Sequence, residues 1–468
     1  MIQYLLLGEG VMKEKLTRYL GDKAFYQRTF QIAFPLALQQ FLSSCMGIVG
    51  TIMVSRINMV TAVGTATQID VLQSLVSYGI ISGVSMFSAQ FYGAKQEANL
   101  KRTFGLGLIL SLINSLFWLM ASALFGRTIL QFYLNDSTIL DYSMQYLRIA
   151  MFSMIPFAIN NTFSALYRST HQARFSLIVS IIGALSNILL NAIFIFGFSF
   201  IPALGVRGSA LGTLISQCIL TITYLIHACV TRQRFLGRFN EIFDLKWSFV
   251  KPILIKIFPL LINETLFGFG MTLFIKAFGE IGTQAMDAYY VANQIFNCFL
   301  FVVYGYGAAI SVLVGTRLGQ GRIELAIQEQ NYYIGLSAVL SIFLVLFMIV
   351  LAQPMVGIFG LKDLVVSNLA CLLVYVFAVK ISMRLFNYMI FSTLKAGGDA
   401  KIIQFLDSGL MYLVGLPLAF VCVYLLNVRD IVVVLLLTQV EQLIRMVLGM
   451  LRLNRRLWAH DLTTLIQK

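Results

Sequence analysis

The sequence predicts an all-α integral membrane protein of twelve transmembrane helices, arranged as two repeated six-helix lobes. Three observations lead to this fold class. The 468 residues are 59% hydrophobic and only 12% charged, whereas a soluble domain carries roughly 25% charged residues. The apolar residues gather in runs of about 20 or more, long enough to cross a bilayer as helices. The second half of the chain also repeats the pattern of the first.

Each apolar run is expected to be helical, because lipid offers no hydrogen-bond partner to an exposed backbone amide or carbonyl. A β-barrel would show short segments of alternating hydrophobicity instead, and the sequence shows none. In chain order, the predicted spans cover residues 31–55, 62–91, 103–126, 140–166, 175–199, 206–230, 249–277, 285–315, 327–352, 364–393, 402–426 and 430–452. Several runs contain Gly, Pro or polar residues, as expected for helices that line a cavity.

The net charge of +14 is interpreted as a topology signal, and no nucleic-acid partner is expected. Lys and Arg cluster at helix ends and in alternate connections, and twenty-four of them fall on the side that would hold both termini. The opposite side has only five, namely Arg56, Arg127, Arg207, Lys362 and Arg429. By the positive-inside rule, both termini are therefore predicted to be cytoplasmic. The basic side also suits anionic lipid headgroups.

The internal repeat is clearest at Pro35 and Pro259, which stand in identical "FPL" openings about half the chain apart. "GVSMFSAQFYGAKQEA" (83–98) matches "GAAISVLVGTRLGQGRIELA" (307–326) at nearly the same offset. Six spans separate equivalent positions, so the halves should have the same orientation in the membrane. Both prolines are expected to kink their helices. The predicted organisation is an N-terminal cytoplasmic segment (1–24), an N-lobe (25–231), a cytoplasmic linker (232–248), a C-lobe (249–455) and a cytoplasmic tail (456–468).

Residues 25–455 resemble the multidrug and toxic compound extrusion (MATE) family. The resemblance is carried by the paired "FPL" openings, "GAKQEA", "NILLNAIFIFG" (187–197), "GVRGSALGTLISQ" (205–217), "GTRLGQG" (315–321), "LKAGGDAK" (394–401) and "GLPLAF" (415–420). It implies a V-shaped molecule of two six-helix lobes that exports drugs without using ATP. No phosphate-binding loop of the GxxxxGK type is present in the sequence, and no enzymatic activity is expected.

The resemblance implies an antiporter that exports cationic or amphipathic drugs or metabolites by alternating access, in exchange for H+ or Na+. The expected partners are a small-molecule substrate and the lipid bilayer, with no obligatory protein partner and no cofactor besides the coupling ion. Two alternatives stay open: an exporter or flippase dedicated to one endogenous metabolite, lipid or glycan, and a transport-inactive sensor or scaffold. Gly-Glu-Gly at 8–10 can be encoded by a ribosome-binding site. This favours Met12 over Met1 as the true start, and a bacterial cytoplasmic membrane as the location.

Many family members carry a cation site in the first lobe, with Asp residues on spans one and five. Here those positions hold Gly50 and Asn191, while the accompanying Asn187 and Thr213 are retained. This degenerate site has no titratable carboxylate. The sequence therefore predicts little coupling through the first lobe.

Glu264 lies in the middle of span seven, at the position where the sodium-coupled branch of the family carries a Glu for a second-lobe cation site. The Asp of that branch on span ten is replaced here by Arg384. A guanidinium occupies the ground that Na+ would need, so H+ is favoured as the coupling ion. Charges at membrane depth cost about 2.5–3.5 kcal/mol each on insertion scales, so they are usually functional or paired. The alternative is therefore a static ion pair between Glu264 and Arg384.

Polar and polarisable side chains on spans one, two, seven and eight are the candidates for substrate contact. Aromatic faces attract desolvated cations, and methionines give a pliable apolar wall. The candidates are Gln40, Gln68, Asp70, Asn263, Met271, Tyr289, Asn293 and Gln294.

Two further charged features lie in the last spans. Glu441 and Arg445 are four residues apart on span twelve, a spacing that places them on one helix face and predicts a salt bridge. Asp407, near the start of span eleven, is expected to pair with Lys401 or Lys380.

Overall fold

The computed structural model describes residues 18–57, 59–132, 137–199, 201–359 and 363–465. Within these ranges the chain forms twelve helices or helix pairs long and apolar enough to cross a membrane, which confirms the predicted number of spans. The two candidate start residues, Met1 and Met12, lie outside the described residues, as do most of the predicted N-terminal segment and the last three residues of the predicted tail.

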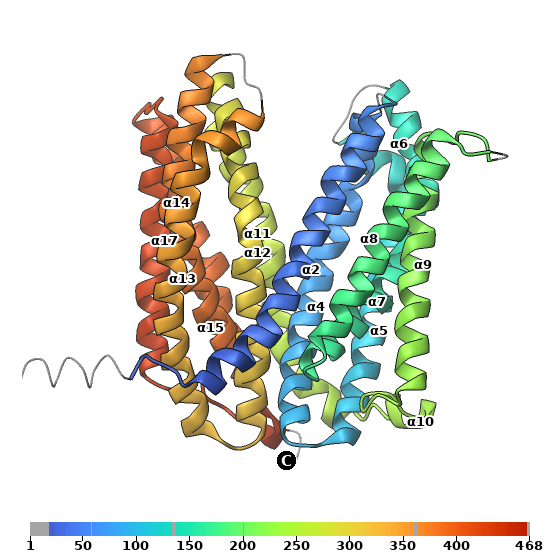
Figure 1. Cartoon of the computed structure of the whole chain (residues 1–468), viewed down its shortest axis with the longest axis vertical. Helices are drawn as coiled ribbons and strands as arrows, with labels where there is room; N and C mark the ends of the chain where they lie inside the picture. Colours follow the sequence, from blue (N-terminus) through green and yellow to red (C-terminus); the bar gives the residue numbers. More distant parts are fainter. Residues whose placement is uncertain (1–17, 58, 133–136, 200, 360–362, 466–468) are drawn as a thin grey trace, which may run out of the picture. The chain divides into compact units, whose positions relative to one another are not determined.

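The helices follow one another with short connections (Figure 1). In the first half they are α2 (Lys23–Ser55), α3 (Val60–Ala66), α4 (Gln68–Gly93), α5 (Glu97–Gln131), α6 (Ser137–Ala150), η1 (Met151–Ser153), α7 (Met154–Ser169), α8 (Ala173–Phe196), α9 (Val206–Val230) and α10 (Phe239–Ile242). In the second half they are α11 (Trp247–Gly279), α12 (Thr283–Gly319), α13 (Ile323–Ile358), α14 (Leu364–Ala396), α15 (Ala400–Gln404), η2 (Phe405–Gly409), η3 (Met411–Gly415), α16 (Leu416–Phe420), η4 (Val421–Leu425), α17 (Ile431–Asn454) and η5 (Leu462–Leu465). Segments η2, η3 and η4 are π-helical, so the eleventh span is a wider coil than its neighbours.

The duplication of the chain is visible in its backbone. Residues with left-handed backbone conformation recur in pairs at the ends of equivalent helices, with one member in each half. The pairs are Lys95 with Gly321, His171 with Gly398, Ser199 with Asn427, and Arg232 with Arg456. The two halves therefore turn at the same places, as the sequence repeat predicts.

The described residues divide into two compact units. The N-terminal unit is Leu38–Leu261, and the C-terminal unit combines the residues up to Ala37 with those from Ile262 onward. Each division falls two residues after a proline, inside α2 after Pro35 and inside α11 after Pro259. The predicted lobes begin instead at residues 25 and 249, before these helices. The structure thus assigns the first part of each of the two helices to the unit formed by the other half of the chain.

Two glycines at equivalent positions of the repeat leave room for the first parts of α11 and α2, which are the exchanged parts of these helices. A Cβ atom added to Gly79 on α4 would lie 2.5 Å from the Cα atom of Leu261, at the end of the exchanged part of α11. A Cβ atom added to Gly305 on α12 would lie 2.5 Å from the Cα atom of Ala37, at the end of the exchanged part of α2. Small residues allow membrane helices to approach closely, so that van der Waals packing holds them together.

An ion pair also holds the first part of α2 in the C-terminal unit. Arg28 Nη2 lies 3.2 Å from Glu329 Oε1, and Arg317 Nη2 lies 3.0 Å from the same oxygen. The Glu329 side chain is only 5% exposed, so two guanidinium groups compensate one buried carboxylate. The first part of α11 has a different anchor in the N-terminal unit, where Phe249 stacks on Phe91.

The linker and the tail are each anchored to their unit by a fully buried aromatic residue. Phe235 in the linker is fully buried against Phe104 and Tyr167, with ring centroids 5.3 and 5.2 Å apart. Trp458 is fully buried in the tail, in the corresponding part of the second half. A Cβ atom at Gly397 would lie 1.7 Å from the Trp458 carbonyl oxygen, so the Gly-Gly pair at 397–398 leaves room for the tail. The repeat therefore extends to the segment after the sixth span of each half.

Within each unit, long helices pack side by side. In the C-terminal unit α14 contacts α12, α13 and α17, and in the N-terminal unit α8 runs beside α9 (Figure 1). Between α8 and α9 the contact uses Gly208 and Gly212, four residues apart, where added Cβ atoms would lie 2.1 Å from Phe194 O and 2.2 Å from Asn191 Oδ1. This small-xxx-small spacing is typical of close membrane helix pairs.

We expect Gly79→Ala and Gly305→Ala each to lower the thermal unfolding temperature of the detergent-solubilised protein. Each added methyl group collides with the backbone of an exchanged helix, and overpacking costs about 1–3 kcal/mol. Gly64→Ala is the control, because a Cβ atom there meets no atom within 4 Å. Equal melting temperatures for all three variants would contradict the role given to the two glycines.

Candidate functional site

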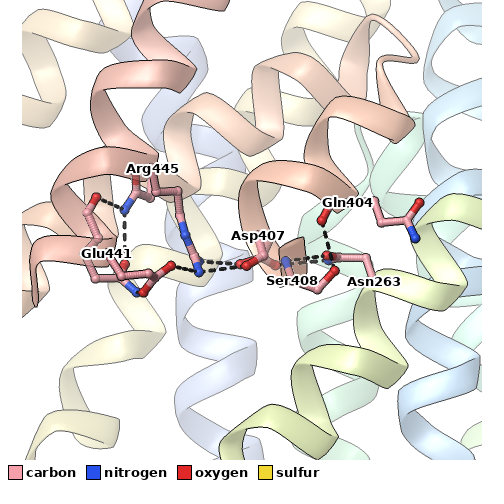
Figure 2. Close-up of polar contacts among 8 residues, drawn as sticks. Asn263, Gln404, Asp407, Ser408, Glu441 and Arg445 are labelled. Carbon is pink, nitrogen blue, oxygen red and sulfur yellow. Dashed lines mark hydrogen bonds and ion pairs between the residues drawn. The ribbon is translucent and has the colours of Figure 1, made fainter. Parts of the chain in front are cut away.

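A network of charged side chains from the eleventh and twelfth spans lies inside the C-terminal unit (Figure 2). Arg445 on α17 donates to both Asp407 Oδ1 and Glu441 Oε1, and also to the main-chain oxygen of Asp407 at 2.8 Å. The side chains of Arg445 and Glu441 are 1% and 4% exposed, and that of Asp407 is 13% exposed. The predicted salt bridge between Glu441 and Arg445 is confirmed. The predicted pairing of Asp407 with Lys401 or Lys380 is wrong, because Arg445 occupies that carboxylate.

Two local features of the chain position this network. Glu441 and Arg445 lie one turn apart on α17, so their side chains meet on one face. Asp407 belongs to the π-helical segment η2, and such segments are frequent at functional sites. Gly415, further along the same span, leaves room for the Glu441 stem, since an added Cβ atom would lie 3.2 Å from Glu441 Cγ.

Asn263 joins the network to α11. Its Nδ2 atom donates to Asp407 Oδ2 at 3.0 Å, and its Oδ1 atom accepts from the Ser408 backbone amide at 3.1 Å (Figure 2). With Arg445 on one oxygen and Asn263 on the other, both oxygens of Asp407 accept hydrogen bonds. Asn263 is itself buried, so it is a structural link to Asp407 as well as a predicted substrate residue.

Glu264 follows Asn263 on α11 and differs from it in surroundings. It is half-buried, and among the described residues no hydrogen bond or ion pair is found for its carboxylate. The charged groups that act on it electrostatically are Lys395, Asp407 and Arg384. Arg384 does not form the predicted alternative, a static ion pair with Glu264. Its guanidinium carbon lies 5.3 Å from the ring centre of Phe267 and 5.5 Å from that of Tyr388.

The predicted first-lobe site is a ladder of amides. Asn191 Nδ2 donates to Asn187 Oδ1 at 3.0 Å, and Asn187 Nδ2 donates to Ser216 Oγ at 3.1 Å. Thr213 donates to the Ser209 carbonyl oxygen of its own helix. Gly50 is not part of this ladder, since an added Cβ atom would meet nothing within 4 Å. The ladder links α8 to α9 by neutral hydrogen bonds.

The remaining predicted substrate residues are not gathered by one contact network. Gln40, Gln68 and Gln294 are exposed, whereas Asp70, Met271 and Asn293 are half-buried. Gln68 donates to the Gly64 carbonyl oxygen of the preceding turn.

Tyr289 is buried instead, with ring centroids 5.4 Å from Phe278 and 6.0 Å from Phe377. Its contacts are those of a packing residue, while the neighbouring Tyr290 is exposed.

Two residues of the charged network carried no signal in the sequence. Gln442 Nε2 donates to Glu441 Oε2 at 2.9 Å, and Asn387 Nδ2 donates to Gln442 Oε1 at 3.1 Å. Both are amides within apolar runs, where many such residues bond only to their own helix. For Asp407 and Arg445, the available signal was their opposite charge on consecutive spans.

We expect Arg445→Met to destabilise the protein by about 3–5 kcal/mol, since it leaves the buried Glu441 and the half-buried Asp407 without their cation. The comparison is Arg127→Met, which removes an ion pair with Asp141 whose side chains are 55% and 60% exposed. Exposed pairs contribute only about 0–1 kcal/mol. Denaturation of both variants in detergent measures the difference. Equal destabilisation would show that Arg445 does not hold the network together.

Comparison with known proteins supports the same architecture. The MatE family model matches this chain twice, over residues 35–193 and 259–421. The two matched stretches begin at Pro35 and Pro259, the equivalent prolines of the internal repeat.

Relatives of similar length carry related sequences. "Uncharacterized transporter YisQ" of Bacillus subtilis (strain 168) is 25% identical over 429 residues, which cover 88% of this chain and 90% of the relative. "Probable multidrug resistance protein NorM" of Mannheimia succiniciproducens is 24% identical over 420 residues, or 87% of this chain and 88% of the relative.

The fold is also found among solved structures. The one described as "Crystal structure of MATE in the bent conformation" matches with a TM-score of 0.82 at 18% identity, over 94% of this chain and 97% of that chain. The family model covers well over half of the chain, in two copies that correspond to the two repeats. This multi-pass membrane protein therefore belongs to the MatE family, the multidrug and toxic compound extrusion transporters.

Proposed function

We propose that the protein is an antiporter that exports cationic or amphipathic small molecules in exchange for H+ by alternating access, with both termini in the cytoplasm of a bacterial cell. Glu264 is the residue proposed to carry the coupling proton. Relatives named as multidrug resistance proteins support export of such compounds. The observation that carries the proposal is a half-buried carboxylate in the middle of a membrane span, with no ion-pair partner among the described residues.

The surroundings of Glu264 support exchange rather than static pairing. A carboxyl group in the middle of a membrane span is stable when it is protonated or paired with a cation. Arg384 lies over two aromatic rings and leaves the Glu264 carboxylate available to a proton or a cationic substrate. A protonated Glu264 is neutral, whereas an ionised one attracts a cation, so proton and substrate compete for one group.

The same surroundings support H+ over Na+. Of the charged groups that act on Glu264, Lys395 and Arg384 are cations and supply no oxygen ligand. A sodium ion also needs several oxygen ligands, whereas a proton needs only one acceptor. The amide ladder of Asn187 and Asn191 contains no carboxylate, so this ladder cannot carry a coupling proton.

For a neutral amphipathic solute, the membrane potential alone is sufficient for useful export. One charge that enters down a membrane potential of 100 mV releases about 2.3 kcal/mol. Since a tenfold ratio corresponds to about 1.4 kcal/mol, one proton per cycle sustains a gradient of a neutral solute of about fifty-fold.

Transport in proteoliposomes tests the proposal, with ethidium as the probe and with proton and sodium gradients imposed separately. We expect ethidium to move against the proton gradient, with no response to sodium. Glu264→Gln should reduce proton-driven transport at least about tenfold, the equivalent of ~1.4 kcal/mol. Glu280→Gln, which changes an exposed carboxylate just after the same helix, is the matched control.

Three results would count against the proposal. Transport driven by sodium alone would replace H+ by Na+. Full proton-driven transport by Glu264→Gln would give Glu264 an architectural role only. A folded wild-type protein that moves neither ethidium nor other amphipathic cations under any gradient would favour a dedicated exporter or a sensor.

A further inference from the structure

The charged network around Arg445 contains more acid than base. One guanidinium lies between two carboxylates, Asp407 and Glu441, so the three groups carry one uncompensated negative charge when all are ionised. Two carboxylates that share one site do not both ionise freely, because each opposes the charge of the other. Burial adds to this opposition, since Glu441 and Arg445 are almost fully enclosed.

Other cations of the C-terminal unit do not close the deficit by direct contact. Lys380 Nζ lies 5.3 Å from the ring centre of Phe296 and 5.1 Å from that of Phe377. Arg384 likewise lies over aromatic rings. Among the described residues, neither side chain makes an ion pair with a carboxylate. Their charge acts on the network only from a distance.

Gln442 makes Glu441 the better proton acceptor of the two acids. Both oxygens of Asp407 are engaged by charged or fixed donors, from Arg445 and from Asn263. In the described part of the chain, the hydrogen-bond donor found for Glu441 Oε2 is the neutral side-chain amide of Gln442. Rotation of a side-chain amide by 180° exchanges the places of its oxygen and its nitrogen. The amide can therefore donate to an ionised carboxylate or accept from a protonated carboxyl.

Asn387 is the second hydrogen-bond partner of the Gln442 side chain. It is fully buried on α14 and donates to Gln442 Oε1, yet its own Oδ1 atom has no hydrogen-bond partner within the described part of the chain. Buried polar atoms are nearly always satisfied. When Gln442 turns to present its oxygen to Glu441, its nitrogen faces Asn387. Asn387 can accept from that nitrogen only by a turn that gives up the 3.1 Å bond from its Nδ2 atom to the Gln442 main-chain oxygen.

We propose that Glu441 is a second protonation site of the transporter, which takes one proton from solvent on Oε2 and so neutralises the buried group of Asp407, Arg445 and Glu441. This inference rests on the proposed proton-coupled function and adds a site to it. No bond other than the new O–H bond forms, and the proton leaves by the same atom. Arg445 still donates to Oε1 of a protonated Glu441, but neutral Glu441 attracts the guanidinium less strongly. Arg445 then bears more fully on Asp407, and thus on the bond from Asn263, the residue next to Glu264 on α11.

Among the described residues, several titratable and charged groups lie near Glu441. Asp407 and Arg445 contact Glu441 or each other, and the remaining groups lie on the helices packed around them. They are Glu264 on α11, Tyr304 on α12, Lys380, Arg384 and Tyr388 on α14, and Tyr412 on η3. Glu264 is the one carboxylate in this list, and no hydrogen bond joins it to Glu441 within the described part of the chain, which keeps the two proposed proton sites separate.

Infrared difference spectroscopy of the full-length protein in liposomes tests the inference without requiring transport. On acidification, the wild-type protein should gain the C=O stretching band of a protonated carboxylic acid from Glu441, in addition to that from Glu264. Glu441→Gln should lose one component, Glu264→Gln should lose the other, and Glu280→Gln should retain both. Glu441→Gln mimics the protonated state, so it should fold.

A second variant keeps the test decisive if Glu441→Gln fails to fold. Asp407→Asn removes the neighbouring negative charge, which should shift the titration of the Glu441 component to lower pH while leaving the component itself. A wild-type spectrum that loses nothing in Glu441→Gln, or an Asp407→Asn titration that does not move, would overturn the inference. If the component is present but ethidium transport is absent, the proposed function fails and the protonation site stands.

Discussion

A charge placed inside a membrane helix has no solvent to stabilise it, and the C-terminal unit is organised around this constraint. Arg445 is enclosed almost completely, so its stability depends on carboxylates that other segments bring to it. Asp407 comes from the eleventh span and Glu441 from the twelfth, and Asn263 from the seventh closes the remaining bond. The helices that meet at this point are therefore held in one arrangement by groups that cannot separate without leaving a charge unpaired.

The two halves share a backbone and differ in chemistry. Left-handed residues recur at equivalent turns, and Phe235 and Trp458 occupy corresponding buried places. Yet the polar contacts between α8 and α9 are neutral amides and hydroxyls, whereas those around α17 are ionic. The two halves thus keep the same backbone, whereas the titratable groups of these contacts lie in the second half. A proton can change the charge of the second set of contacts but not of the first.

The exchange of helix ends between the halves has an equally simple physical basis. Pro35 and Pro259 each remove one backbone donor within a long helix, and the chain passes from one compact unit to the other two residues later. Gly79 and Gly305 then admit the exchanged helices to backbone contact. One exchanged end is further held by Glu329 and its two arginines, and the other by aromatic stacking. Equivalent positions thus reach the same packing through different side chains.

The sequence by itself determined the number of spans, the repeat and its offset, and the Glu441–Arg445 pair, because each follows from a pattern that can be read along the chain. Apolar length decides whether a helix crosses a bilayer, and a spacing of four decides which side chains share a face. Only the tertiary structure decided that Asp407 meets Arg445 on the next span, and that Tyr289 is packed inside a unit. Such contacts depend on which helices lie side by side and on how each is rotated. In the π-helical eleventh span, that rotation departs from the regular period on which a reading of the sequence relies.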